Sequence, residues 1–409
     1  MSERFSIVVP AFNEEDAVEG VLRSCLAAAD GICEQGAVDS VEVILVDDGS
    51  TDATREIASR IEGVRVVRHE TNRGYGAALM TGFRAAEGDC LGFLDGDGTC
   101  DPEAFGGMLK RLREGGADLA IGMRLGAGTR MPLVRRIGNR FFAALLRLLS
   151  GRKVRDAASG MRVFRRSLLP AMGALPEGLD FTPAMTSRVA FDPALSFTEH
   201  PIPYAERSGD SKLGVLRDGL RFLRAITGLA ISYRPGPFFY LAAGLLWGVA
   251  VGYTIPTVAG LALGAGLPVV EQVSQGDIPI WMLHRLLTIM VAAVAGLVFF
   301  LAGAAGQRIA HLVHGLPAPG SRGLSGVAKR LVAGLPATKA AALMAAGAVV
   351  LAGPAVTYLR TWHVLAPWYR VLAGLFLVLA ASVYAVYAVQ DRMISAWERR
   401  RRLEDAERR

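Results

Sequence analysis

Hydrophobic and polar positions follow one pattern before residue 235 and another after it. In the first part, short apolar runs alternate with stretches in which apolar residues recur at helical spacing. The apolar runs are Phe5–Val9, Val41–Val46, Val64–Val67 and Leu91–Leu94. Strands that alternate with helices form βαβ units, so this pattern predicts an α/β fold with a Rossmann-like, mostly parallel sheet flanked by helices.

Beyond Pro235 the chain is rich in Ala, Gly, Leu and Val and carries few charges. Because a helix needs about 20 apolar residues to cross a bilayer, we expect four membrane spans, at 237–260, 280–304, 340–359 and 368–390. Buried helices of a soluble protein are the less favoured alternative, since polar links separate the stretches. The expected domains are an α/β domain at 1–212, an amphipathic helix at 213–235, a membrane domain at 236–390 and a basic tail at 391–409.

The distribution of charge predicts an orientation in the membrane. The net charge is +7, and Lys and Arg gather in 306–339 and 397–409, whereas 261–279 contains neither. By the positive-inside rule, the α/β domain and the C-terminus face the cytoplasm from an inner cell membrane. Basic residues beside apolar stretches fit anionic lipid, so no nucleic-acid partner is expected. The four cysteines form no CxxC pair, which fits a reducing compartment.

Polar residues gather where three of the predicted strands end, namely Asn13 and Glu14, Asp47 and Asp48, and Asp95 and Asp97. Ligands of open α/β sheets bind beyond the carboxyl ends of the strands, which makes this edge the candidate site. Asp95 and Asp97 lie one residue apart, and such a pair suits Mg²⁺ or Mn²⁺ shared with a diphosphate. A solvated Asp-Gly turn is the alternative. The sequence has no P-loop and no GxGxxG after the first strand, which disfavours an NTPase of that class and a dehydrogenase.

Four sequence blocks resemble one known family. They are Val8–Glu15, Val46–Asp52, Asn72–Ala78 and Asp95–Gly98, which read VVPAFNEE, VDDGSTD, NRGYGAA and DGDG. In this order and spacing they resemble family 2 glycosyltransferases of the GT-A fold, and within that family the dolichyl-phosphate and polyprenyl-phosphate sugar synthases. The resemblance implies an enzyme of cell-envelope glycan synthesis. It would transfer one sugar from a UDP- or GDP-linked donor to polyprenyl phosphate with inversion, in a metal-dependent reaction.

The resemblance also implies which residues hold the donor and the metal ion. The implied donor residues are Pro10, Asn13, Glu14, Asp47, Asp48 and Asp95, and the implied metal ligands are Asp95 and Asp97. Carboxylates suit the hydroxyl and N–H donors of a nucleoside. Helix capping and turn formation are the alternative roles for Glu14 and Asp48. This chain has Gly98 and Thr99 where many relatives have Leu-Gln, which leaves any contact made by that Gln in doubt.

A phosphate acceptor is already ionised near neutral pH and needs cationic positioning more than a general base. The resemblance places Arg124 near the phosphates, and Arg135 and Asn139 have the spacing of an acceptor-binding Arg and Ser in relatives. Asp156 either orients the acceptor near the reacting centre or pairs with Arg162. The resemblance also implies a loop over the diphosphate that carries Arg207, Ser211 and Lys212. The implied catalytic residues are Asp95, Asp97, Arg124 and Asp156.

Two segments have the pattern of amphipathic helices that lie in a membrane interface. In 133–149 the basic face carries Arg136, Arg140 and Arg147, and the apolar face carries Ile137, Phe141, Leu145, Leu148 and Leu149. In 213–234 the apolar residues are Leu216, Leu220 and Leu223, with Arg217, Arg221 and Arg224 beside them. Both helices would hold the α/β domain near a lipid acceptor. A packing helix with a solvated basic face is the alternative for the first.

Two other functions stay open at this stage. One is the same donor chemistry with another acceptor, such as a diacylglycerol, a sphingolipid or a growing glycan. The other is a glycolipid transport or assembly protein whose α/β domain binds a nucleotide sugar. The sequence does not specify the base, the sugar, the length of the lipid chain or the oligomeric state, and a homo-oligomer is compatible with it.

Overall fold

The computed structural model describes residues 3–124, 131–205, 214–262 and 280–314, and positions within 342–356 and 371–394. The chain divides into two compact units, Met1–Ala230 and Ile231–Arg409, and each is described by itself below. The predicted diphosphate loop with Arg207, Ser211 and Lys212 lies outside the described residues, as does nearly all of the basic tail.

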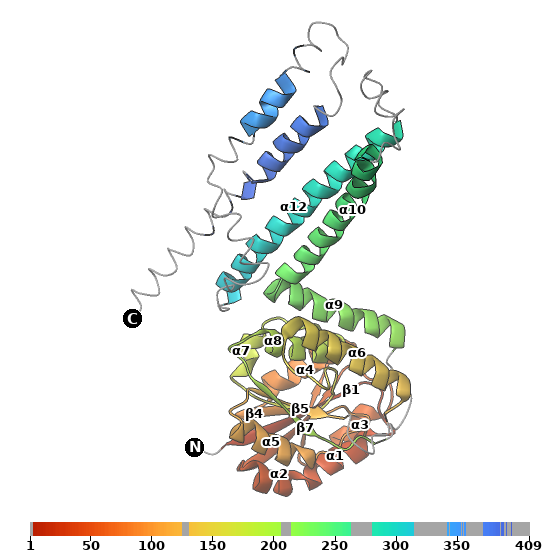
Figure 1. Cartoon of the computed structure of the whole chain (residues 1–409). Coiled ribbons are helices and arrows are strands. Elements are labelled where there is room, and N and C mark those ends of the chain that lie inside the picture. Colours follow the sequence, from red (N-terminus) through yellow and green to blue (C-terminus); the bar gives the residue numbers. More distant parts are fainter. Residues whose placement is uncertain are drawn as a thin grey trace, which may run out of the picture. The chain divides into compact units, whose positions relative to one another are not determined.

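The first unit is built on a seven-stranded sheet in the order β3-β2-β1-β4-β6-β5-β7 (Figure 1). Neighbouring strands are parallel except where β6 pairs antiparallel with β4 and β5. The predicted α/β fold with a mostly parallel sheet is therefore confirmed. The strands are β1 (Arg4–Ala11), β2 (Ser40–Asp47), β3 (Val64–Arg68), β4 (Cys90–Phe93), β5 (Leu119–Met123), β6 (Arg162–Arg165) and β7 (Phe197–Pro201).

Helices cover both faces of this sheet (Figure 1). The helices of the first unit are α1 (Val18–Ala27), α2 (Ala29–Gly36), α3 (Thr54–Ser59), α4 (Tyr75–Ala85), α5 (Ala104–Glu114), α6 (Leu133–Ser150), α7 (Leu168–Met172) and α8 (Phe181–Phe191). A ninth, α9 (Val215–Tyr233), begins in the first unit and ends in the second. Two hydrophobic cores result, one between the sheet and α1, α2 and α5, the other between the sheet and α4 and α8.

Strand β1 contributes side chains to both cores because successive residues of a strand point to opposite faces. Ile7 and Val9 pack in the first core, and Val8 packs in the second. All three side chains are fully buried. A strand that is covered on both faces reads as a continuous apolar run, which is why the sequence revealed it. Helix α4 approaches β1 so closely that a Cβ added at Gly82 would overlap Val8.

Among its described residues, the second unit contains two helices that are long and apolar enough to cross a membrane, within α10 (Gly236–Ala262) and α12 (Ile280–His314). They pack against each other through Tyr240 and Phe300, whose ring centroids lie 5.3 Å apart. Two of the four expected spans thus have a counterpart among the described residues. The expected spans at 340–359 and 368–390 are not confirmed, because the second contains a shorter apolar helix, Val371–Tyr384, and the first is described at scattered positions.

Candidate active site

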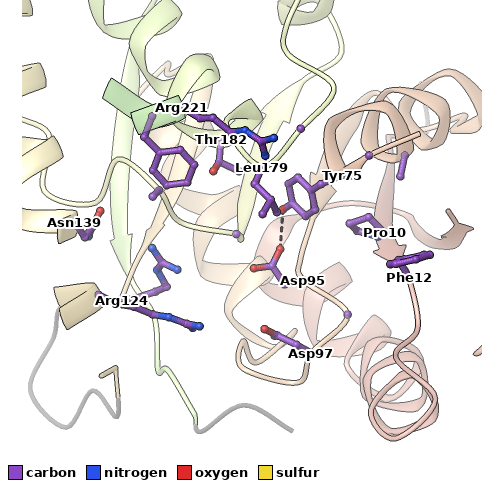
Figure 2. A pocket seen from close by; sticks show the side chains of 18 of the residues that line it. Pro10, Phe12, Tyr75, Asp95, Asp97, Arg124, Asn139, Leu179, Thr182 and Arg221 are labelled. Atoms are coloured by element: carbon purple, nitrogen blue, oxygen red, sulfur yellow. Dashed lines mark hydrogen bonds between the residues drawn. The ribbon is translucent and has the colours of Figure 1, made fainter. Parts of the chain in front are cut away.

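A cavity of about 430 Å³ opens beyond the carboxyl ends of β1, β2 and β4 (Figure 2). It lies in the first unit, and most of the residues predicted for the site line it. The predicted residues along its wall are Pro10, Glu14, Asp48, Asp95, Asp97, Arg124, Arg135 and Asn139. Asn13, Asp47 and Asp156 were predicted for the site as well, but they are not part of this wall. Residues predicted to bind the donor, the metal ion and the acceptor therefore line one cavity.

Asp95 and Asp97 are held by neighbours that leave both on the cavity wall. The Tyr75 hydroxyl donates a hydrogen bond to Oδ1 of Asp95 at 2.7 Å. Burial, and then the Asp95 charge, raise the pKa of Tyr75 well above 10, so this phenol keeps its proton and remains a donor. Oδ1 of Asp97 accepts hydrogen bonds from the Thr99 hydroxyl at 2.7 Å and the Thr99 backbone N–H at 3.1 Å. The Asp-Gly turn and the carboxylate site were alternatives in the sequence, and here the turn is what presents the carboxylate.

These two carboxylates fit a small divalent cation. Among the described residues, no cluster of three or more His, Cys, Asp and Glu side chains could hold a metal ion. Mg²⁺ and its substitutes need no such cluster, since they are held by one or two carboxylates together with substrate phosphates and water. Asp95 and Asp97 on an open cavity wall supply that donor set.

On the donor side of the cavity, Asp48 fixes the loop before α4. Its carboxylate accepts hydrogen bonds from the backbone N–H groups of Arg73 and Gly74 at 2.9 and 2.8 Å. A ring nitrogen of His69 lies 2.7 Å from Oδ1 of the same carboxylate, and the other ring nitrogen lies 2.9 Å from the Thr81 hydroxyl oxygen. Asp48 is 3% exposed. It shapes this wall of the cavity, a role nearer to the turn-forming alternative.

Asn13 and Asp47 also serve the loops around the site. Asn13 adopts a left-handed backbone conformation with φ of 50°, and its Oδ1 accepts a hydrogen bond from the Thr51 N–H at 2.8 Å. Oδ1 of Asp47 accepts one from the Ser50 N–H at 2.9 Å. Both side chains thus hold the segment after β2 in place. Their part in donor binding stays a prediction, and Oδ2 of Asp47 is buried without a hydrogen-bond partner among the described residues.

Arg124 reaches the cavity from the end of β5 and is held there by Asp156. Its Nε and Nη2 donate to the two carboxylate oxygens of Asp156, each at 2.9 Å. Asp156 is fully buried. Burial alone would raise the pKa of Asp156, but the Arg124 guanidinium lowers it below its usual value, so the carboxylate is ionised. Asp156 was predicted as a catalytic residue. In the structure it is buried behind Arg124 and is not part of the cavity wall, so we propose that it acts by positioning Arg124.

The predicted alternative, a pairing of Asp156 with Arg162, is not the arrangement found. Arg162 is fully buried, and it donates to the backbone carbonyls of Ser159 and Ala157 at 3.1 and 3.0 Å. Burial lowers its pKa from 12.5 to about 10, which still leaves it protonated at neutral pH. Its positive charge beneath the site acts electrostatically on Tyr75, Asp156 and Asp95.

Helices α6 and α9 contribute a further part of the wall, together with Leu179 and Thr182 around the start of α8. Arg135 and Asn139 line the cavity from α6, and Arg221 and Phe222 line it from α9. Phe222 packs edge-on against Phe142 of α6, with ring centroids 5.7 Å apart. Neither amide atom of Asn139 has a hydrogen-bond partner among the described residues, although the side chain is 5% exposed. Sequence reasoning missed Tyr75 and Arg221 as site residues. Tyr75 lies in the NRGYGAA block, but the block assigned it no role, and the arginines of 213–234 look alike.

Comparison with known proteins identifies the family. The model of glycosyl transferase family 2 matches residues 6–173. The low-salt glycan biosynthesis hexosyltransferase Agl6 of Haloferax volcanii is 34% identical over 60% of this chain and 60% of its own length. The undecaprenyl-phosphate 4-deoxy-4-formamido-L-arabinose transferase of Edwardsiella ictaluri is 31% identical over 52% of this chain. The dolichyl-phosphate hexose transferase of Haloferax volcanii is 32% identical over 56% of this chain.

These matches differ in how much of each relative they cover. The chain spans 60% of the first relative and 63% of the second, but it spans 95% of the dolichyl-phosphate hexose transferase. These matches disfavour the alternative of a transport or assembly protein without transferase activity. The dolichyl-phosphate hexose transferase is 32% identical to the chain, which covers 95% of its length. Together with the match to the family model, this shows that the chain belongs to glycosyl transferase family 2 and is a glycosyltransferase.

Proposed function

We propose that this enzyme transfers one sugar from a UDP- or GDP-linked donor to polyprenyl phosphate. The observation that supports this best is that one cavity combines the carboxylates Asp95 and Asp97 with the arginines Arg124 and Arg135. The carboxylates suit the metal-bound diphosphate of a donor, and the arginines suit a second phosphate. Two of the relatives are named for transfer involving a lipid phosphate, dolichyl or undecaprenyl.

On the donor side, Asp95 and Asp97 would hold a Mg²⁺ or Mn²⁺ ion, which when bound neutralises the diphosphate as it leaves. Tyr75 and Thr99 orient these carboxylates through their hydroxyl groups. Pro10 and Glu14 line the same cavity and would contact the nucleoside. The protein thus binds the leaving group at one end of the cavity and leaves the anomeric carbon to face the other.

On the acceptor side, the reaction needs orientation rather than proton removal. An ionised phosphate oxygen forms the new bond to the anomeric carbon while the bond to the donor diphosphate breaks, and that electron pair leaves with the nucleoside diphosphate. Attack from the opposite side inverts the anomeric centre. Arg124 and Arg135 would position the attacking phosphate by charge-assisted hydrogen bonds. Asp156 keeps the Arg124 guanidinium in a fixed plane, which is how a buried carboxylate contributes without acting as a base.

The α/β unit would meet its lipid acceptor at the membrane surface. One side of α6 exposes large apolar residues, among them Leu133 at 67% and Leu148 at 80%. Ile137 and Phe141 are exposed on the same helix. Exposed apolar residues of this size on a helix rich in arginine fit a position between head groups and acyl chains. We assign this site to the cytoplasmic face of the cell membrane, on the charge distribution of the sequence.

A transfer assay tests the proposal. Purified full-length protein in detergent is given undecaprenyl phosphate, Mn²⁺ and a panel of radiolabelled UDP- and GDP-sugars, and label in the organic phase is counted. We expect lipid-linked label with at least one donor, and a loss of about 100-fold or more in Asp97→Asn. Asp101→Asn, which changes an exposed aspartate outside the cavity, is the matched control. Failure of every donor to label the lipid contradicts the proposal.

A further inference from the structure

Arg221 lines the cavity, and the proposed reaction assigns it no role. It lies on α9, whose arginines the sequence assigns to a lipid-facing surface, yet its side chain lines the same cavity as Asp95 and Arg124 (Figure 2). Its neighbours Arg217 and Arg224 on α9 are exposed and are not part of the cavity wall. One arginine of the three is therefore turned into the site.

The structure holds Arg221 in this position from two sides. Nη1 donates a hydrogen bond to Oδ1 of Asp218 at 3.1 Å. Asp218 is itself 3% exposed, and its other oxygen accepts the Gly214 N–H at 2.8 Å, which ties it to the start of the helix. On the next position of the helix, Phe222 is packed against Phe142. Both the side chain and the helix that carries it are thus fixed relative to α6.

Arg221 keeps the capacity to bind an anion. A guanidinium has five N–H donors in a fork that matches phosphate oxygens. Among the described residues, Asp218 accepts one hydrogen bond from Arg221, and the Arg221 side chain is 44% exposed. Its remaining donors therefore face the cavity or solvent. Asp218 accepts one N–H of the guanidinium. This orients the side chain and leaves its other N–H groups available to a ligand.

The position of Arg221 favours the acceptor over the donor. The carboxylates and the nucleoside-facing residues Pro10 and Glu14 come from the sheet edge, whereas Arg221 comes from the wall made by α6 and α9. Asn139 of α6 lies on this wall too, and its buried amide has no hydrogen-bond partner among the described residues. A buried, unpartnered polar group signals a ligand that completes it. Arg221 of α9 and Asn139 of α6 therefore both have polar atoms on the cavity wall that a ligand could engage.

The geometry points to Arg221 as a further binding residue for the phosphate of the lipid acceptor, with Asp218 as its positioning residue. This inference rests on the proposed function, since it assigns a residue to the acceptor of that reaction. It also gives α9 a second role. The helix that continues from the first unit into the second would carry one of the groups that grip the substrate head group.

Binding measurements on the full chain in detergent test the inference without knowledge of the sugar. The probes are farnesyl phosphate, farnesol, and UDP and GDP with Mn²⁺. We expect wild-type protein to bind farnesyl phosphate more tightly than farnesol. Arg221→Ala should weaken farnesyl phosphate binding roughly 10-fold or more while leaving farnesol, UDP and GDP unchanged. Arg221→Lys should weaken it less. Arg224→Ala, on the exposed side of α9, is the matched control and should match wild type.

The possible results separate this inference from the proposed function. Should Arg221→Ala keep the full preference for farnesyl phosphate, or lose affinity for UDP or GDP instead, the acceptor role of Arg221 is overturned and the proposed function stands. An equal loss of farnesol and farnesyl phosphate would show a packing effect and also overturn it. A wild-type protein without preference for the phosphate over the alcohol contradicts the proposed function itself. The unfolding midpoint of each variant, measured by calorimetry, confirms that it folds.

Discussion

The carboxylate of Asp156 grips the guanidinium of Arg124 through two parallel hydrogen bonds of 2.9 Å each. A third hydrogen bond, 3.1 Å long, runs from the Arg124 backbone N–H to the same carboxylate. This planar, two-point contact fixes both the position and the plane of the guanidinium. Any role for Arg124 in holding a phosphate therefore depends on a residue that does not touch the substrate.

Substituting Asp156 should damage stability and activity together. Asp156→Asn keeps the shape of the side chain but leaves the buried Arg124 charge without its counter-ion, which costs about 3 kcal/mol of unfolding free energy. We expect a lower unfolding midpoint by calorimetry and a clear loss of transfer rate. Arg124→Lys keeps the charge and loses the two-point contact, so it should lose rate as well. Full rate in Asp156→Asn would contradict the positioning role.

The ion pair of Arg124 and Asp156 should also make the stability of the protein depend on pH in the acid range. The Arg124 guanidinium lowers the pKa of Asp156 in the folded protein, whereas an Asp in the unfolded chain has a pKa of about 3.9. The stability that this pair contributes is therefore complete above about pH 4 and is lost as the pH falls through the lowered folded pKa. The gap in unfolding midpoint between wild type and Asp156→Asn should narrow below pH 4. A gap that stays constant from pH 7 to the acid limit would refute this assignment.

Thr99 lies two residues beyond Asp97 and contacts its carboxylate. Its hydroxyl donates to Asp97. Thr99→Val keeps the volume but removes this donor, and the loss of a hydrogen bond to a charged group predicts about a tenfold lower rate and a higher Mn²⁺ requirement. Thr99→Ser keeps the hydroxyl and should stay close to wild type. If the Val variant shows an unchanged Mn²⁺ titration, Thr99 does not orient Asp97.

The apolar side of α6 should matter for membrane substrate and not for folding. Ile137→Asp and Phe141→Asp each place a charge where we propose acyl chains, and losing that burial costs about 1.5–3 kcal/mol. Transfer to undecaprenyl phosphate in liposomes should fall about tenfold or more, while UDP or GDP binding in detergent stays unchanged. Ala27→Asp, an exposed position on α1, is the control. Equal rates for all three variants in liposomes would rule out α6 as the membrane contact.

Sequence reasoning found β1 to β4 and missed β5, β6 and β7. Strand β5, Leu119–Met123, is as apolar as the strands that were found, whereas β6 and β7 are more polar. Strands β1, β2 and β4 are mostly apolar and largely buried, and their pattern is visible without any tertiary information. Strand β6 reads Arg-Val-Phe-Arg, and its buried Arg162 looks like a surface residue until the fold encloses it. Strand β7, Phe197–Pro201, carries Thr, Glu and His and lies at the edge of the sheet. Polar strands are recognised by their neighbours, which a single sequence does not provide.

The site shows the same division. Asp95 and Asp97 could be placed because the end of a buried strand fixes their location, and both line the cavity. The partner of Arg124 could not be placed, since Asp156 is 32 residues away along the chain and meets it through the packing of loops. Arg221 could not be distinguished from Arg217 and Arg224 because helical spacing does not tell which side of α9 meets α6. A local sequence pattern does not predict contacts that depend on how helices pack against one another.

The most direct test of the whole account is the mass of the lipid product. Wild-type protein is incubated with undecaprenyl phosphate and the donor that gives label, and the organic phase is examined by mass spectrometry. We predict a product that equals the acceptor plus one sugar residue and contains a single phosphorus atom, because the sugar alone moves to the phosphate. A product with two phosphorus atoms, or a sugar attached to a lipid without phosphate, would contradict the account.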